Sequence, residues 1–177
     1  SLGFTCDTLL AAELVTAAGR VVTASAGSNP ELFWGIRGGG GNFGVVTRMT
    51  LRLHPVGPLL LGGMLLYPAA QALEVMRSWT TFMATAPDEV GGAVAFVTAP
   101  PADFVPPALR GQPAVGVVVC YLGDVDRGRE GLAPLLGLGA PAVTMVQPMP
   151  YVALQELIDG ANRHGLRNYW SADFYGE

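Results

Sequence analysis

The chain has 177 residues, of which 50% are hydrophobic and 14% charged, and its net charge at pH 7 is -4. This length allows one or two domains with a real core, and the apolar content excludes a disordered tail. All ten basic residues are scattered arginines, which argues against nucleic-acid binding. The sequence has no run of 18 apolar residues, so it predicts no membrane span. The two cysteines, Cys6 and Cys120, are expected to be free thiols, because they lie far apart without a metal-binding spacing.

The first third of the sequence predicts a small sheet with one short helix. Residues 9–16 and 20–25 read as two strands of a hairpin. Ser28 and Asn29 are capping residue types, and the helix is expected from Pro30 to about Arg37. Its apolar side chains Leu32, Phe33 and Trp34 are expected to pack on the sheet.

A third strand is expected over residues 43–54, where apolar and polar side chains alternate from Thr47 onward. Proline and glycine between Pro55 and Pro58 interrupt this pattern, and a new periodicity begins after them. We therefore place a domain boundary here, with one domain over residues 1–57 and a second over 58–177.

The second domain is expected to contain two βαβ halves. The predicted order is β-α-β-β-α-β between Leu59 and Gln147, which is the ferredoxin-like arrangement of an antiparallel sheet with helices on one face. A further helix is expected from Tyr151 to Ile158. The buried face of the first of these helices is predicted from apolar spacings of three and four, at Leu73, Met76, Trp79, Phe82 and Met83.

The most specific stretch is the glycine run Gly38–Gly41, between the aromatic end of the first helix and the apolar strand that follows. Glycine lets backbone N–H groups approach a ligand closely, and several such donors together suit a phosphate. The alternative is a tight turn before a core strand. Arg37, just before the glycines, is a candidate either for phosphate contact or for capping the helix carbonyls.

Three stretches resemble one family: NPELFWGIRGGGGNFGVVTRMTLRLHPVG, TCDTLLAAELVTAAGRVVTAS and RNYWSADF. All are similar to the berberine-bridge-enzyme-like FAD oxidoreductases of the vanillyl-alcohol-oxidase type superfamily. The resemblance implies an α+β chain with the end of a PCMH-type FAD-binding domain followed by part of a substrate domain. Family members are two or three times as long, so the chain resembles an internal fragment. Their pyrophosphate loop and C-terminal active-site region are not recognised in it.

The resemblance also implies site residues. The backbone near the glycine run is expected to lie against the adenosine-diphosphate part of FAD. A turn earlier in the chain is expected to lie near the flavin. These residues are Thr5, Cys6, Asp7, Gly40, Gly41, Asn42, Gly44, Val45 and Val46. Substrate contacts are implied for Asn168, Tyr169 and Trp170, although Ser171 stands where relatives often have lysine. We assign no catalytic base and no metal site, since neither His54 nor His164 has partners with catalytic or metal-ligand spacing.

The resemblance implies an FAD-dependent oxidoreductase that moves a hydride from an alcohol or amine carbon of a small-molecule substrate to the flavin, often with O2 as acceptor. The chain alone is expected neither to retain FAD nor to turn over. Its expected partners are the remaining N- and C-terminal parts of the parent or a second copy. The alternative is a non-catalytic ferredoxin-like module for interaction or small-ligand binding, which would not need the conspicuous Gly38–Thr47 block.

Overall fold

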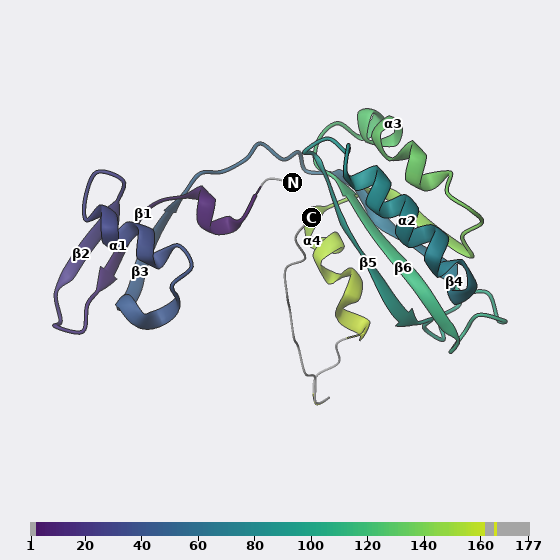
Figure 1. Cartoon of the computed structure of the whole chain (residues 1–177), viewed down its shortest axis with the longest axis horizontal. Helices are drawn as coiled ribbons and strands as arrows, with labels where there is room; N and C mark the ends of the chain where they lie inside the picture. Colours follow the sequence, from purple (N-terminus) through teal and green to yellow (C-terminus); the bar gives the residue numbers. More distant parts are fainter. Residues whose placement is uncertain (1–2, 162–164, 166–177) are drawn as a thin grey trace. The chain divides into compact units, whose positions relative to one another are not determined.

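The computed structural model describes residues 3–161 and residue 165. The chain divides into two compact units, Ser1–Pro55 and Val56–Glu177, and each is described by itself. Figure 1 gives the element labels. Within the described residues, no helix has the length and apolar character needed to cross a membrane.

The first unit is a three-stranded antiparallel sheet with one helix. Strands β1 (Leu9–Val15), β2 (Val21–Ser25) and β3 (Val45–Leu51) lie in the order β2-β1-β3. Helix α1 (Pro30–Ile36) follows β2. The predicted hairpin and third strand are present, but β3 is shorter than expected at both ends: it starts after the 3-10 turn Gly40–Phe43 and ends at Leu51.

The core of this unit is small. Leu14 and Ala24 from the sheet pack with Phe33 from α1. Trp34 was expected to pack here too, and that prediction is wrong, because its side chain is 74% exposed. Successive helical residues point in different directions, so only one of these two adjacent aromatic residues can face the sheet.

The second unit has the predicted ferredoxin-like order. Its elements in chain order are β4 (Leu60–Pro68), α2 (Ala72–Met83), β5 (Val90–Thr98), β6 (Pro113–Tyr121), α3 (Val125–Leu136) and β7 (Val143–Met149), and then α4 (Tyr151–Gln155). The strands lie in the order β5-β6-β4-β7, and every neighbouring pair is antiparallel.

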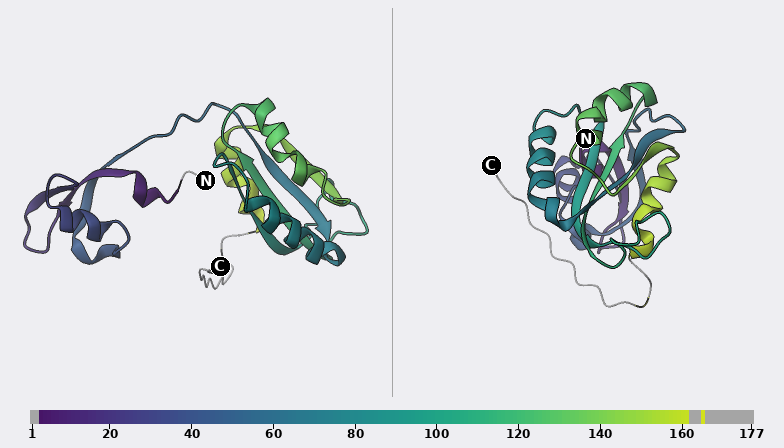
Figure 2. Two further views of the ribbon diagram at one scale, coloured as in Figure 1. Left: turned by 45° about the horizontal axis from the view of Figure 1, so that its top comes forward. Right: turned by 90° about the vertical axis from the view of Figure 1, so that its right-hand side faces the viewer.

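Helices α2 and α3 pack on one face of this sheet, as Figure 2 shows. Val75 from α2 and Leu132 and Leu135 from α3 join inward-facing strand residues such as Leu65 and Val117 in one buried cluster. The opposite face contacts α4, whose Leu154 lies close to Gly62. A second cluster on that face includes Leu66, Ala99, Val105, Leu109, Ala114 and Val143.

The buried face of α2 differs in part from the predicted one. Trp79, Phe82 and Met83 pack against the core as expected. Leu73 and Met76 do not, because they are 62% and 36% exposed, while Val75 is buried in their place. The face that meets the sheet runs through Ala72, Val75, Trp79, Phe82 and Met83. Apolar residues therefore lie on both the buried and the exposed side of this helix, and their spacing alone did not show which side is buried.

We expect Leu132→Ala to lower the free energy of unfolding of the chain by about 2–5 kcal/mol, because it opens a cavity at a fully buried position. The matched control is Leu73→Ala, for which we expect a change within about 0.5 kcal/mol, since that side chain is exposed. Denaturant unfolding followed by circular dichroism measures both. Equal losses would contradict the assigned faces.

Candidate functional site

The glycine segment begins where α1 ends. The backbone N–H of Arg37 donates to the carbonyl of Trp34 at 3.2 Å, which closes the last turn. Gly38 and Gly40 then take positive φ angles of 138° and 70°. Such angles favour glycine because they strain residues with a Cβ. The chain thus turns away from the helix axis and enters the 3-10 turn that leads to β3.

The Phe43 ring holds the segment in place. A Cβ added to Gly35 would lie 2.8 Å from Cζ of Phe43, so the ring packs directly on the helix backbone. A Cβ at Gly39 would meet both the Phe43 ring and the carbonyl oxygen of Gly35. The backbone N–H of Gly39 donates to that same carbonyl at 2.9 Å. Asn42 adds a side-chain hydrogen bond from Nδ2 to the carbonyl of Gly39, also at 2.9 Å.

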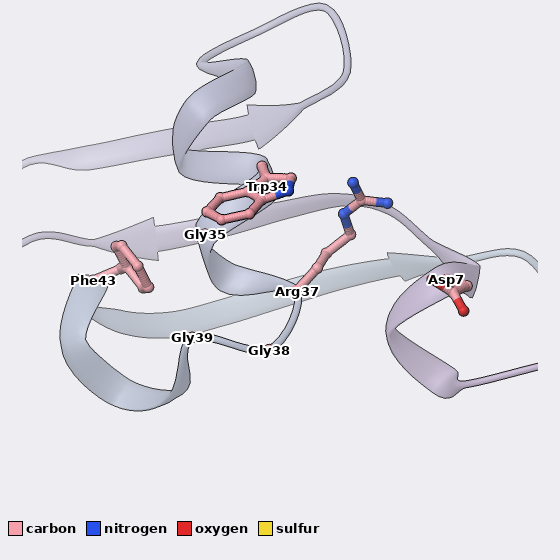
Figure 3. A pocket seen from close by; sticks show the side chains of 7 residues that line it. All are labelled: Asp7, Trp34, Gly35, Arg37, Gly38, Gly39 and Phe43. Atoms are coloured by element: carbon pink, nitrogen blue, oxygen red, sulfur yellow. The ribbon is translucent and has the colours of Figure 1, made fainter. Parts of the chain in front are cut away.

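A pocket of about 500 Å³ lies beside this segment. It is lined by Asp7, Trp34, Gly35, Arg37, Gly38, Gly39 and Phe43 (Figure 3). Asp7 comes from a separate 3-10 turn, Thr5–Thr8, that precedes β1. The fold therefore brings the Thr5–Asp7 turn and the glycine run to one place, although 30 residues separate them in the sequence.

The predicted contact residues lie in three different settings. Asp7 lines the pocket, and Thr5 and Cys6 share its turn. Gly40, Gly41 and Asn42 continue the segment in the 3-10 turn, outside the pocket lining. Gly44, Val45 and Val46 lead into and begin β3, and Val45 is 71% exposed. The three expected substrate residues, Asn168, Tyr169 and Trp170, lie outside the described residues.

The pocket also includes Trp34 and Arg37. Trp34 was expected in the core, and its exposed indole instead lines the pocket. Arg37 was expected either to contact phosphate or to cap the helix carbonyls. No hydrogen bond from its side chain to a carbonyl is found in the described part of the chain, and its Nε is buried without a partner. Its guanidinium carbon lies 4.9 Å from the centre of the Phe33 ring, in a cation–π contact. The signal for Arg37 was its position directly before the glycines.

Among the described residues, no group of three or more His, Cys, Asp or Glu side chains could hold a metal ion. Cys6 and Cys120 are free, as predicted. Burial raises the pKa of the Cys120 thiol, which disfavours the reactive thiolate. Burial also raises the pKa of Tyr67, whose hydroxyl donates to the carbonyl of Leu138 at 3.1 Å.

The packing of Phe43 predicts opposite outcomes for two glycines of the same segment. Gly35→Ala should destabilise the first unit by roughly 1–3 kcal/mol, because the new methyl group overpacks against the Phe43 ring. Gly41→Ala should be close to neutral for folding, since a Cβ there meets nothing within 4 Å. Hydrogen exchange of β1 amides in the two variants measures the difference. Similar protection in both would contradict the described packing.

The raised pKa of Cys120 predicts slow alkylation. At neutral pH the thiol stays protonated, so iodoacetamide should modify Cys120 more slowly than a free cysteine in a short peptide. The rate should rise with pH, and its midpoint should lie above that of the peptide thiol. The measurement is mass spectrometry of the Cys6→Ser variant across pH. A midpoint at or below the peptide value would contradict the assignment.

No family model matches the chain. It is 32% identical to an FAD-linked oxidoreductase of Dictyostelium discoideum over 179 residues, which covers 100% of this chain and 36% of that protein. It is 32% identical to (R)-6-hydroxynicotine oxidase of Paenarthrobacter nicotinovorans, covering 95% of this chain and 36% of that enzyme. The chain thus spans about a third of the length of these relatives.

Solved structures agree with the sequence relatives. The crystal structure of 6-hydroxy-D-nicotine oxidase from Arthrobacter nicotinovorans matches with a TM-score of 0.70 and 28% identity, over 90% of this chain and 34% of that one. A BBE-like protein of Physcomitrella patens matches with a TM-score of 0.66 and 25% identity, over 92% of this chain and 33% of that one. The sequence resemblance is confirmed: the chain is homologous to about a third of a berberine-bridge-enzyme-like FAD-linked oxidoreductase of the vanillyl-alcohol-oxidase type.

Proposed function

We propose that this chain forms part of the FAD site and one wall of the substrate cavity in a longer FAD-dependent oxidoreductase. The whole protein would take a hydride from an alcohol or amine carbon of a small molecule onto the flavin. In this proposal residues 1–57 belong to the FAD-binding domain and residues 58–177 to the substrate domain. The support is the homology to FAD-linked oxidoreductases, together with the open space beside the backbone at Gly41 in the glycine segment.

The observation that carries the proposal is Gly41. The other glycines near it have reasons within the chain: Gly39 and Gly44 have no room for a Cβ, while Gly38 and Gly40 take positive φ angles. Gly41 has neither constraint, because its φ is not in the positive region and a Cβ there would meet nothing within 4 Å. Gly27 is equally unconstrained but lies outside the glycine run, so open space alone does not identify a contact. Within the run, such a glycine fits a position where a ligand comes close to the backbone.

The surrounding residues fit an FAD contact of limited extent. Gly40, Gly41 and Asn42 would hold the adenosine-diphosphate part through the backbone, with Gly44, Val45 and Val46 beside them. Thr5, Cys6 and Asp7 would lie near the flavin from the turn before β1. FAD, when bound, supplies the redox chemistry, and these residues bind and orient it. The pocket in this unit is small, so the chain alone is not expected to retain FAD.

The first test compares absorption spectra of the purified full-length parent and of this chain. We expect a flavin spectrum in the parent only. No flavin in the parent, even after incubation with FAD, would contradict the proposal. It would also favour the non-catalytic ferredoxin-like module.

We expect Gly41→Val in the full-length parent to lower the flavin content per protein at least severalfold, because the side chain would occupy the space of the bound cofactor. The matched control is Gly27→Val, since Gly27 also has open space around it and no positive φ. Flavin is quantified by its absorbance relative to protein, and the melting temperatures of the two variants are compared to confirm that both are folded. Equal flavin content in both variants would count against contact at Gly41.

A further inference from the structure

Arg37 carries a positive charge that nothing in the described part of the chain neutralises. The residue is half-buried, and its Nε is buried without a hydrogen-bond partner. The ion pairs found among the described residues involve Arg110 and Arg129, both in the other unit. A buried donor without an acceptor costs stability, so its persistence needs an explanation. Nε is closed off by neighbouring atoms, so an acceptor for the charge must meet the terminal N–H groups of the guanidinium.

The guanidinium is held in place rather than free to search for that acceptor. It lies over the ring of Phe33, which is 7% exposed and belongs to the core of the first unit. Figure 3 shows the side chain of Arg37 reaching along the pocket next to the indole of Trp34. A half-buried guanidinium that stacks on a core ring at a pocket wall is suited to bind an anion, because the stacking restricts the side chain before binding.

The pocket also limits where an anion can bind. Gly38, the next residue, has open space where a Cβ would stand, so a bulky group can come close to the backbone beside the guanidinium. Asp7 lines the same pocket, and no ion pair joins it to Arg37 in the described part of the chain. An anion beside Asp7 would be repelled. The anion is therefore expected at the Arg37 guanidinium, next to the Trp34 indole and away from Asp7 (Figure 3).

We propose that Arg37 binds a phosphate oxygen of the FAD diphosphate through its guanidinium. This inference rests on the proposed function, since it assumes that the glycine segment meets FAD, and it adds a charged side chain to contacts otherwise made by backbone. The fork of N–H donors in arginine matches phosphate geometry and forms strong charge-assisted hydrogen bonds. The contact would use the terminal N–H groups of the guanidinium, because Nε itself is buried.

The test uses apo full-length parent, prepared from a riboflavin-starved host, and two ligands. FAD carries the diphosphate, whereas riboflavin has the same ring system without phosphate. Binding is followed by quenching of flavin fluorescence. Arg37→Gln should weaken FAD binding on the order of tenfold or more, the loss typical of a hydrogen bond to a charged group. Riboflavin binding should stay within about twofold of the wild type. The matched control is Arg20→Gln, in an exposed hairpin turn, which should change neither affinity.

A second variant keeps the proposal testable should Arg37→Gln fail to fold. Arg37→Lys keeps the charge and the apolar stem but loses the planar fork and the Nε donor, so it should still weaken FAD selectively relative to riboflavin. Equal losses for the two flavins would show that Arg37 only supports the fold and would overturn the inference. Unchanged FAD affinity in both variants would overturn it as well. Failure of the proposed function looks different, because then the wild-type parent would bind neither flavin.

Discussion

The packing of the Phe43 ring against two glycines determines the shape of the first unit at its candidate site. The ring rests on Gly35 within α1 and on Gly39 after it, at distances that leave no room for a side chain. Because the ring is held between the helix end and β3, the intervening residues must turn outward. Gly35, Gly39 and Phe43 all line the pocket, so this packing forms one of its walls. Trp34 and Arg37, which lie before and after the helix end, complete the lining on that side.

The second unit uses glycine in a related way. A Cβ at Gly92 in β5 would overlap the carbonyl oxygen of Val118 in β6 and would lie 2.8 Å from the indole of Trp79. Its absence lets α2 lie close to the sheet through that indole. Here, as at Gly35, the neighbour that needs the space belongs to the same chain. Gly41 has no such neighbour, and that contrast, rather than the number of glycines, is the reason to regard it as a contact position.

Strands were predictable from the sequence because alternation and punctuation by proline and glycine act locally, and the second unit has the expected β-α-β-β-α-β order. Side-chain direction was less predictable. Phe33 and Trp34 are equally apolar, yet only Phe33 meets the sheet. Asn29 was recognised as a capping type, but its side chain donates to the carbonyl of Thr23 at 2.8 Å instead of capping α1. The role of Arg37 depended on whether helix carbonyls lie within its reach, which only the three-dimensional arrangement decides.

Strand β3 constrains how any cofactor can meet this unit. Val45 and Val46 are consecutive, so their side chains point to opposite faces of the sheet. One ligand can contact both only through the backbone, and β3 is an edge strand, so its outer backbone is open. Contact through backbone requires no particular side chain there, which accounts for valine after the glycines. The exposed side chains of Val45 and Met49 then need a different cover, since bare apolar edge strands promote association. In the relatives, about two thirds of the sequence lies outside the aligned segment, and we expect the cover to come from there.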